Sequence, residues 1–566
     1  MLPSLTIEDF EQRFADRHLI HGAVEKWARE RPEEIALIDS DRDQGVTSAS
    51  FDQMSTAVAL NLLEAGFRKG DCFATVLPLT SEHLFLEYAC FKIGVVFVPL
   101  DLRLGPAELR RSLELVDAKG LAFTKCPAVP DAGALLKELG SRALRLLLQS
   151  APESECIEGA TPVSSLLRAA MNSVRSAAGK KEGELREAYA TAHAAVGEND
   201  GALVIFTTGS TGSPKPALLS HRNVSCQAMC ISRLLSSDKP LMTLVNLPAS
   251  HVGCQTELLM GTLFEGGTAV LVPVFDPSQS MRAIAKYGVT AIGQIPAMFQ
   301  FEWRLKDYES FDLSSLDFAA YGGQQVSSEF IAKMASMATS VGTGLGLTEA
   351  AGFCTYIRRE RARASDCVST LGTAQPVYPM TIRGALREDG AAGAELPAGA
   401  LGHVCFKGPQ TFLGYLNDPI ATASAVSSDG FLYTGDMGYH DSEGLHLSGR
   451  AKLVIKPSGY QVFPGDVERH FSALPEVATC TVVGIEHPVI SEAIVAFVEV
   501  KQGAELTPQA LEKHARELTT YMRPRHYVLL NPGETPLNRV AKADYLILRE
   551  RAKREVEQLR AKGLWR

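Results

Sequence analysis

Hydrophobic positions in residues 21–150 alternate between a helical period and short unbroken apolar runs. Apolar residues three and four apart predict amphipathic helices, whereas apolar runs of about five residues predict buried strands. The elements predicted in this way are helices at residues 23–29 and 51–65 and strands at Ile35–Asp39 and Cys72–Val76. Such alternation is typical of an α/β layer built on parallel strands.

The most apolar stretch of the chain, residues 84–100, is interrupted by Glu87 and Lys92. It is too short and too charged for a transmembrane helix. We therefore expect a buried helix that leads into a strand, and no membrane span.

The rest of the chain divides by pattern. Residues 165–199 are rich in alanine, lysine and glutamate, which predicts a solvated helical excursion or a mobile insert. The α/β pattern resumes at Ala202, and β segments punctuated by glycine and proline dominate residues 372–447. A smaller α/β unit follows and ends in a charged helix at residues 544–562.

Composition narrows the class of protein. The chain has 566 residues, 46% hydrophobic and 21% charged, which excludes a disordered chain, a collagen-like fibre and a coiled coil. The net charge of -9 argues against a nucleic-acid binder, which usually carries a basic excess. No signal peptide is evident, and eleven scattered cysteines without a Cys-x-x-Cys pair favour reduced thiols. We expect a cytoplasmic protein without a nucleic-acid partner.

A run of small and hydroxyl residues follows a predicted strand at residues 202–206. The run contains Thr207, Thr208, Gly209, Ser210, Thr211, Gly212, Ser213, Pro214 and Lys215. Glycines let backbone N–H groups approach an anion closely, and the hydroxyls and the lysine add donors and charge. The spacing is not that of a Walker A loop. It predicts a phosphate loop of another type.

This loop resembles that of the adenylate-forming (AMP-binding) enzymes, which include acyl- and aryl-CoA synthetases, luciferases and nonribosomal adenylation domains. Pro216 stands where that family usually has glycine. The resemblance covers nearly the whole chain, because the other motifs follow in the family's order. It implies an α/β fold with a large N-terminal body, made of α/β layers and a small β-barrel-like part, and a small mobile α+β C-terminal domain.

The next motifs resemble the family's acid and nucleotide sites. His251, in a Leu-Pro-Ala-Ser-His run, resembles a histidine beside the acid carboxylate. No aspartate lies between Leu247 and Glu257 to pair with an ammonium group, which favours an acid without an α-amino group. The other expected pocket residues are Ala297, Tyr321 and Gly322.

The nucleotide is expected to contact glycine-rich turns and two charged residues. By resemblance these turns contain Gly322, Gly323, Gln324, Gly344, Leu345, Gly346 and Thr348. Glu349, with Thr208, is expected to hold Mg²⁺, a hard ion that prefers oxygen ligands. Asp436 in Tyr-Thr-Gly-Asp is expected to accept hydrogen bonds from the ribose, with Arg450 on the same sugar.

The C-terminal motifs imply a reaction in two steps. Lys452 resembles the hinge, which divides the chain into domains 1–451 and 452–566. Lys542 resembles the lysine that neutralises charge during adenylate formation. Lys456 and Gly459 resemble the segment that faces the site during thioester formation.

The predicted reaction is ATP-dependent activation of an apolar carboxylic acid, fatty or aromatic, followed by thioester formation with coenzyme A. ATP, Mg²⁺ and coenzyme A are the expected cofactors. One alternative is an acyl-AMP ligase that loads a carrier protein. Another is a non-catalytic adenylate-binding relative, supported by Pro216 and by Leu345, which stands where the family usually has an aromatic residue.

Overall fold

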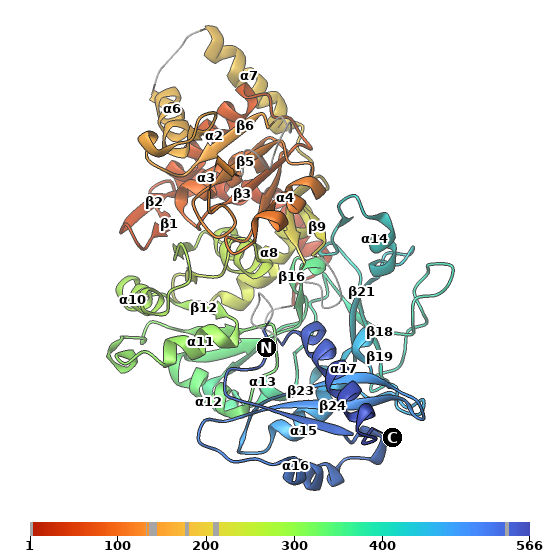
Figure 1. Ribbon diagram of the computed structural model, residues 1–566. Helices are drawn as coiled ribbons and strands as arrows, with labels where there is room; N and C mark the ends of the chain where they lie inside the picture. Colours follow the sequence, from red (N-terminus) through yellow and green to blue (C-terminus); the bar gives the residue numbers. More distant parts are fainter. Residues whose placement is uncertain are drawn as a thin grey trace. The chain divides into compact units, whose positions relative to one another are not determined.

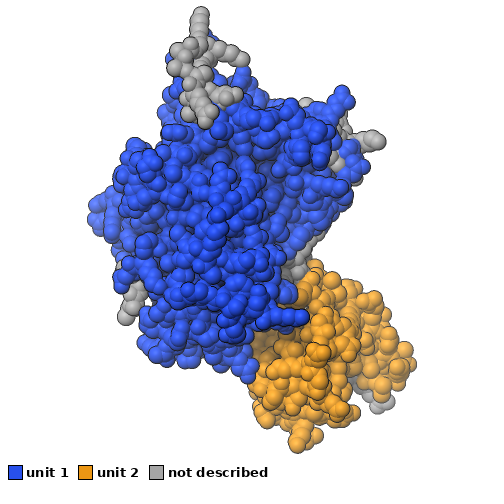
Figure 2. Space-filling model, turned by 90° about the vertical axis from the view of Figure 1, so that its left-hand side faces the viewer, with its two compact units in different colours: residues 1–207, 215–380, 406–432 blue, residues 208–214, 381–405, 433–566 orange. Residues whose placement is uncertain are grey.

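A computed structural model describes residues 4–131, 133–134, 144–175, 180–207, 214–537 and 543–565. The chain forms two compact units, which Figure 2 shows in two colours. The first contains residues 1–207, 215–380 and 406–432, and the second contains residues 208–214, 381–405 and 433–566.

The first unit contains two large sheets. The strands of one are β1 (Ile35–Asp39), β2 (Gln44–Thr47), β10 (Met242–Val245), β11 (Thr268–Leu271), β12 (Ala291–Gln294), β13 (Phe318–Tyr321), β14 (Ser340–Thr343) and β17 (Ile357–Glu360). Their order is β17-β14-β13-β12-β10-β11-β1-β2. The inner strands pair in parallel, and the outer strands β2 and β17 are antiparallel to their neighbours.

The second large sheet carries the phosphate loop. Its strands are β3 (Cys72–Val76), β4 (Val96–Pro99), β5 (Gly120–Phe123), β6 (Leu146–Gln149), β7 (Thr161–Pro162), β8 (Gly201–Phe206), β9 (Pro216–Ser220) and β20 (Gly414–Tyr415). Their order is β20-β9-β8-β4-β3-β5-β6-β7. β9 runs antiparallel to both of its neighbours, β8 and β20.

Helices connect most of these strands, as Figure 1 shows. They are α1 (Ile20–Glu30), α2 (Ser48–Glu64), α3 (Ser81–Lys92), α4 (Pro106–Leu115), α6 (Val163–Arg175), α7 (Lys180–Ala194), α8 (His221–Leu235), α9 (Met260–Phe264), α10 (Pro277–Tyr287), α11 (Pro296–Trp303), α12 (Ser328–Met337), α13 (Asp366–Ser369) and α14 (Pro419–Ala425). A two-stranded ribbon, β15 (Gly346–Leu347) and β16 (Gly352–Phe353), completes this unit.

Two smaller sheets make up most of the second unit. One has the order β18-β19-β21-β22 and the other the order β23-β24-β25. The strands are β18 (Met380–Arg383), β19 (Gly402–Phe406), β21 (Leu432–Asp441), β22 (Gly444–Arg450), β23 (Val477–His487), β24 (Ser491–Val500) and β25 (His526–Leu530). The helices are α15 (Pro464–Ser472), α16 (Pro508–His514) and α17 (Tyr545–Ala561).

The hydrophobic pattern located the early elements well. The strands predicted at Ile35–Asp39 and Cys72–Val76 are β1 and β3, and the apolar stretch at residues 84–100 is α3 followed by β4. The terminal charged helix is α17, with Asp544 as its N-cap. The predicted α/β fold class is confirmed. In the described part of the chain, no helix combines the length and the apolar character needed to cross a membrane.

The segment at residues 165–199, predicted to be a solvated helical excursion, contains α6 and α7 in its described part, and most residues of α7 from Gly183 onward are exposed. Both helices nevertheless contact α2. The Asn61 side chain in α2 donates to the carbonyl of Leu166 in α6 at 3.2 Å. His193 in α7 contacts Glu25 in α1 at 2.8 Å. The insert is therefore packed by polar contacts that its own composition does not reveal.

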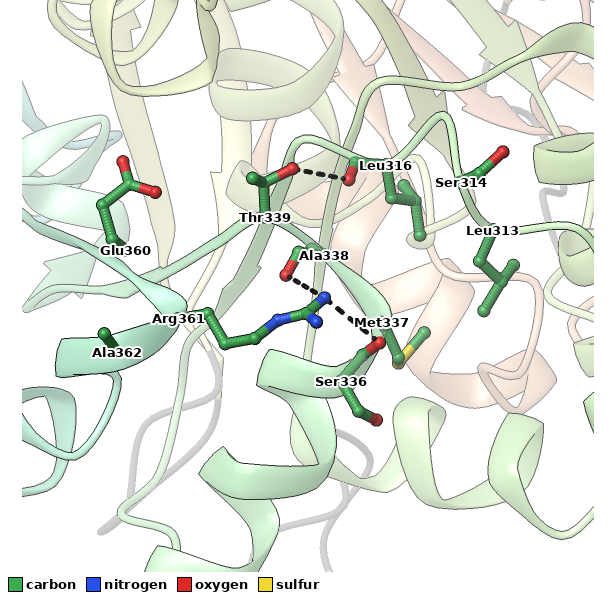
Figure 3. Close-up of a pocket in the computed structure, with 10 residues that line it drawn as sticks. All are labelled: Leu313, Ser314, Leu316, Ser336, Met337, Ala338, Thr339, Glu360, Arg361 and Ala362. Atoms are coloured by element: carbon green, nitrogen blue, oxygen red, sulfur yellow. Dashed lines mark hydrogen bonds between the residues drawn. The ribbon is translucent and has the colours of Figure 1, made fainter.

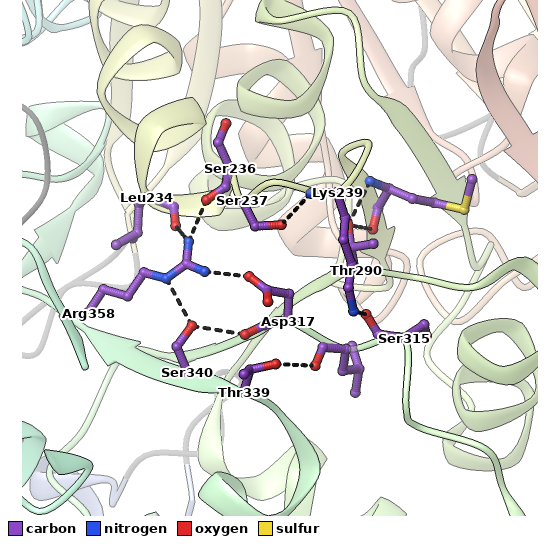
Figure 4. Close-up of polar contacts among 12 residues, drawn as sticks. Leu234, Ser236, Ser237, Lys239, Thr290, Ser315, Asp317, Thr339, Ser340 and Arg358 are labelled. Carbon is purple, nitrogen blue, oxygen red and sulfur yellow. Dashed lines mark hydrogen bonds and ion pairs between the residues drawn. The ribbon is translucent and has the colours of Figure 1, made fainter. Parts of the chain in front are cut away.

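At the amino-terminal edge of β13 and β14, a polar network links these strands with β17 and the end of α8 (Figure 4). Arg358 in β17 donates to Asp317, to the hydroxyl of Ser340 and to the carbonyls of Leu234 and Ser236. Its ion pair with Asp317 spans 2.6 Å. The planar guanidinium serves several acceptors at once. It thereby fixes the end of α8 against the sheet, on the edge away from the glycine-rich turns.

Two glutamates are fully buried beside glutamine side chains in the first unit. Burial raises the pKa of Glu302 to about 8, and the side-chain amide of Gln294, 2.7 Å away, lowers it in part. Burial likewise raises the pKa of Glu87 to about 8, against a smaller lowering by Gln255. A buried carboxyl group favours its neutral form because the charged form loses hydration. Both groups are thus protonated at neutral pH.

We predict that Glu302→Gln and Glu87→Gln weaken the pH dependence of stability. The native carboxyls stay protonated up to about pH 8, whereas in the unfolded chain they ionise near their ordinary pKa of 4.5. The native state therefore binds more protons across this window, so the free energy of unfolding falls as pH rises from about 4.5 to 8. Each substitution should remove the contribution of one carboxyl group to this fall in the free energy of unfolding, on the order of 1 kcal/mol or more.

Thermal midpoints between pH 5 and 8.5 measure this effect. The exposed Glu309→Gln is the control and should keep the wild-type slope. A slope equal to wild type in both buried variants would contradict the assignment.

Candidate active site

The phosphate loop is held at both ends by backbone pairing. The N–H of Thr207 donates to the carbonyl of Lys215 at 2.9 Å, directly beyond the pair Phe206–Pro216. Pro216 begins β9, a position where the missing N–H of proline is tolerated in a strand. The expected loop residues Thr208, Gly209, Ser210, Thr211 and Gly212 lie outside the described residues. The described stems thus form an antiparallel strand pair that extends to Thr207 and Lys215.

Tyr415 joins two of the expected charged residues. Its hydroxyl donates to Oε1 of Glu349 at 2.5 Å, and the ammonium of Lys215 lies 4.9 Å from the centre of its ring. A tyrosine hydroxyl that donates to a carboxylate fixes the position of that carboxylate, and the ring face attracts the cation. Lys215 and Glu349, predicted separately, therefore belong to one cluster.

His251 lies two residues before a π-helical turn, Gly253–Leu259. Such turns often accompany functional sites. The N–H of Gly253 donates to Nδ1 of His251 at 3.0 Å. In the neutral ring this contact puts the proton on Nε2, which becomes the hydrogen-bond donor. The geometry suits a histidine that donates to a carboxylate oxygen.

Glu257, on the same turn, is a site residue that sequence reasoning missed. Its Oε1 accepts from the N–H of Phe353 at 2.7 Å. A Cβ atom at Gly253 would lie 3.2 Å from Oε2 of Glu257 and 3.1 Å from Nδ1 of His251, so the two side chains are neighbours. Burial raises the pKa of Glu257 to about 7, yet the residue keeps some accessible surface. Glu257 is therefore a carboxyl group that is neutral in part near pH 7 and lies beside His251.

The ring of Phe353 brings the glycine-rich turns together. A Cβ atom at Gly346 would lie 2.7 Å from this ring, and one at Gly322 would lie 3.2 Å from it. At Gly344 a Cβ atom would lie 2.0 Å from the carbonyl oxygen of Thr355, which excludes any side chain there. The glycines therefore allow close approach of segments that follow β13 and β14.

The remaining residues of these turns differ in exposure. Gly323, with a φ of 95°, and Gln324 are exposed, Thr348 is half-buried and Leu345 is buried. Gly323 adopts the left-handed backbone region that favours glycine. Their expected contact with a nucleotide stays a prediction.

Two expected pocket residues have different surroundings. Tyr321 is buried, its hydroxyl donates to the carbonyl of Cys367 at 2.8 Å, and its ring packs against Phe330. Its side chain thus belongs to the core. Ala297, in the first turn of α11, is half-buried. The roles of both residues in the pocket stay predictions.

In the second unit, Asp436 and Arg450 face each other across β21 and β22. Nε of Arg450 lies 2.9 Å from Oδ1 of Asp436, and the same guanidinium donates to the carbonyl of Thr434 at 3.1 Å. Asp436 is buried, whereas the Arg450 side chain is 46% exposed. The two residues that are expected to contact the same ribose therefore form a cross-strand ion pair.

The other C-terminal residues lie on loops of the second unit. Lys452 is exposed within a short 3₁₀ turn, Ala451–Leu453. Lys456 is exposed, and its N–H donates to Glu492 at 2.6 Å. Gly459, with a φ of 85°, shares a tight turn with Ser458, whose φ is 51°. Lys542 lies outside the described residues.

A hollow at the opposite edge of the first sheet contains none of the predicted residues (Figure 3). Leu316 and Thr339 line it just before β13 and β14, and Arg361 lines it just after β17. Gly322 and Gly344 instead follow the carboxyl ends of β13 and β14. Ligands of open α/β sheets bind at the carboxyl ends of the strands, so this hollow is not the candidate site.

Comparisons with known proteins identify relatives over most of the chain. The feruloyl-CoA synthase of an Amycolatopsis species is 29% identical over 82% of this chain and 86% of its own length. The indoleacetate–CoA ligase of Aromatoleum aromaticum is 28% identical over 92% and 96%. The ATP-bound MatB of Rhodopseudomonas palustris has the same fold, with a TM-score of 0.78, 22% identity and coverage of 95% and 99%.

Two family models match the chain. One, the AMP-binding enzyme family, matches residues 24–416, and the other, the AMP-binding enzyme C-terminal domain, matches residues 466–542. The family reaction converts an acid to an acyl-AMP and then to a coenzyme A thioester. The predicted family and the predicted AMP-forming acid–CoA ligase, which uses ATP and coenzyme A, are confirmed. This chain belongs to the AMP-binding enzyme family.

Proposed function

We propose that this ligase activates an apolar carboxylic acid, preferably an aromatic one. The observation that carries the proposal is the arrangement around Phe353, which brings His251, Glu257 and the glycine-rich turns into one neighbourhood. The relatives named for feruloyl-CoA and indoleacetate support an aromatic acid over a fatty one.

Within this proposal, each group of residues binds one part of the substrates. The loop from Thr207 to Lys215, with Thr208, binds the phosphates of ATP, and Asp436 with Arg450 binds the ribose. Glu349 offers a partly accessible carboxylate, the oxygen donor that Mg²⁺ prefers, so the residue fits this ion. Bound there, Mg²⁺ would neutralise phosphate charge. His251 orients the acid carboxylate through its Nε2 proton.

The second half of the proposal concerns the C-terminal segment. Lys542 stabilises charge as the adenylate forms, and a rotation about Lys452, between domains 1–451 and 452–566, then presents Lys456 and Gly459 for thioester formation. The Ser458–Gly459 turn supports this role, because two positive φ values hold it in one shape. We place the reaction in the cytoplasm, since the eleven cysteines form no disulfide within the described residues.

The decisive experiment is a panel of aromatic and fatty acids assayed for AMP release with and without coenzyme A. We expect coenzyme A-dependent turnover with an aromatic acid, and loss of at least about 100-fold in Lys542→Ala, because that variant lacks the cation that stabilises the transition state. The Lys562→Ala variant, at the end of α17, is the control.

Other outcomes would select the alternatives. Acid-dependent exchange of pyrophosphate into ATP without consumption of coenzyme A would favour a ligase that loads a carrier protein. Absence of exchange with every acid would favour a non-catalytic adenylate-binding relative.

We predict that Glu349→Gln raises the Mg²⁺ concentration for half-maximal pyrophosphate exchange at least ten-fold, because the amide lacks the negative charge. Tyr415→Phe should raise it several-fold, since it removes the hydroxyl that holds Oε1 of Glu349 but keeps the ring beside Lys215. Tyr287→Phe is the matched control, because that hydroxyl also donates to a carboxylate, Oδ1 of Asp43, at 2.8 Å. An unchanged Mg²⁺ requirement in both site variants would refute this role.

We also predict that KM for the acid rises as pH increases through about 7. Glu257 loses its proton in this range, and its negative charge then repels the substrate carboxylate beside His251. Glu257→Gln should flatten the KM profile between pH 6 and 8.5 because its side chain stays neutral. The exposed Glu309→Gln should follow wild type. A Glu257→Gln profile as steep as wild type would exclude Glu257 from the acid pocket.

A further inference from the structure

A polar cluster outside the candidate active site lies where α1, α7 and α8 meet. His21 and Glu25 lie four residues apart on α1 and therefore share a face of that helix. His193 comes from α7, and His221 is the first residue of α8. The ring centroids of His21 and His193 are 4.9 Å apart, and those of His21 and His221 are 5.7 Å apart. Three helices thus direct imidazoles into one small volume.

His21 makes no hydrogen bond to the described residues, although it is completely buried. Both of its ring nitrogens lack a partner there. A buried polar group without a hydrogen bond costs on the order of 1–3 kcal/mol, so such a group in a packed core needs an explanation. Nε2 of the neighbouring His221 lacks a partner in the described structure as well. A ligand between the helices would satisfy His21.

Three donors around this position have the chemistry of a metal site. One ring nitrogen each from His21 and His193 and one carboxylate oxygen of Glu25 all lie within 4.8 Å of one another. Ligands about 2 Å from a tetrahedral metal are roughly 3.3 Å apart, so small side-chain rotations would close the site. His193 and Glu25 already approach to 2.8 Å. Both are partly exposed, at 29% and 22%, which leaves an entry path for an ion.

The local charges favour a cation despite a nearby lysine. Nζ of Lys92 lies 3.9 Å from Glu25, but it donates to Oδ1 of Asp52, to the carbonyl of Asp52 and to the hydroxyl of Thr56. The two negative charges of Glu25 and Asp52 exceed the single positive charge of Lys92.

We propose that His21, Glu25 and His193 form a zinc site that fastens α7 to α1. Two imidazole nitrogens and one carboxylate are a ligand set that suits Zn²⁺, with a water molecule as the fourth ligand. The ion would replace the direct contact between His193 and Glu25 and satisfy the buried imidazole of His21. The site is separate from the ligase reaction: its function is to hold the α6–α7 insert against the body.

A second cluster of similar composition offers a matched control. His470 and His514 in the second unit stack at 4.1 Å, and Glu517 lies 3.8 Å from His514. There each imidazole already bonds the backbone carbonyl of the other, at 3.1 and 3.2 Å, and Glu517 is exposed. These histidines thus have partners without an ion, and nothing in this second cluster calls for one.

The test is metal uptake by the full-length protein without an affinity tag. After treatment with EDTA and its removal, Zn²⁺ is titrated by calorimetry without nucleotide, and Co²⁺ is added as a spectroscopic probe of tetrahedral coordination. We expect one Zn²⁺ per chain and visible absorption from Co²⁺. His193→Ala and Glu25→Gln, which change partly exposed residues, should weaken binding at least ten-fold, and His514→Ala should not.

A second readout concerns the insert itself. Zn²⁺ should slow hydrogen exchange of the amides in residues 183–193 of α7 in wild type but not in His193→Ala. The proposal is overturned if wild type takes up no Zn²⁺ at tens of micromolar. It is also overturned if His193→Ala and Glu25→Gln bind as tightly as wild type, or if His514→Ala abolishes uptake. Each variant is first checked for ligase activity, which this proposal expects to persist.

Discussion

The ring of Phe353 is the contact on which the candidate site depends. It occupies the space that side chains at Gly322 and Gly346 would need, while its backbone N–H holds the carboxyl of Glu257. Three loops that are distant in the sequence are thus brought to one aromatic ring. A β-carbon at Gly346 would lie 2.7 Å from this ring and would displace it, although the ring has little room in a close-packed interior.

The sheets determine where this arrangement can form. β12, β13 and β14 are parallel neighbours, so their carboxyl ends meet at one edge, and the loops that follow β13 and β14 carry the glycines. At the other edge, an ion pair between Asp317 and Arg358 links the start of β13 with β17. In the second large sheet, β20 pairs with β9 and brings Tyr415 close to Lys215. Backbone pairing, rather than local sequence, thus connects the phosphate loop with Glu349.

The sequence allowed the elements and the family to be predicted, because strand and helix periods and the loop motifs are local signals. It did not reveal Tyr415, whose importance arises only when β20 joins a strand two hundred residues earlier. Glu257 gave only a weak signal, as a carboxylate in an apolar run, and Phe353 gave none. Similarly, the polar contacts of α6 and α7 depend on partners in α1 and α2 that no window of residues 165–199 contains.

The position of β9 between two antiparallel neighbours has a mechanical consequence. A strand paired on both sides cannot detach without breaking two hydrogen-bond ladders, so the stem of the phosphate loop and the segment with Tyr415 should unfold as one cooperative piece. Pro216 supplies no donor at the start of this strand, but its carbonyl accepts from Leu416 at 2.8 Å. The sequence of the loop between the stems could therefore change without altering the strand pairing that supports both Lys215 and Tyr415, the partner of Glu349.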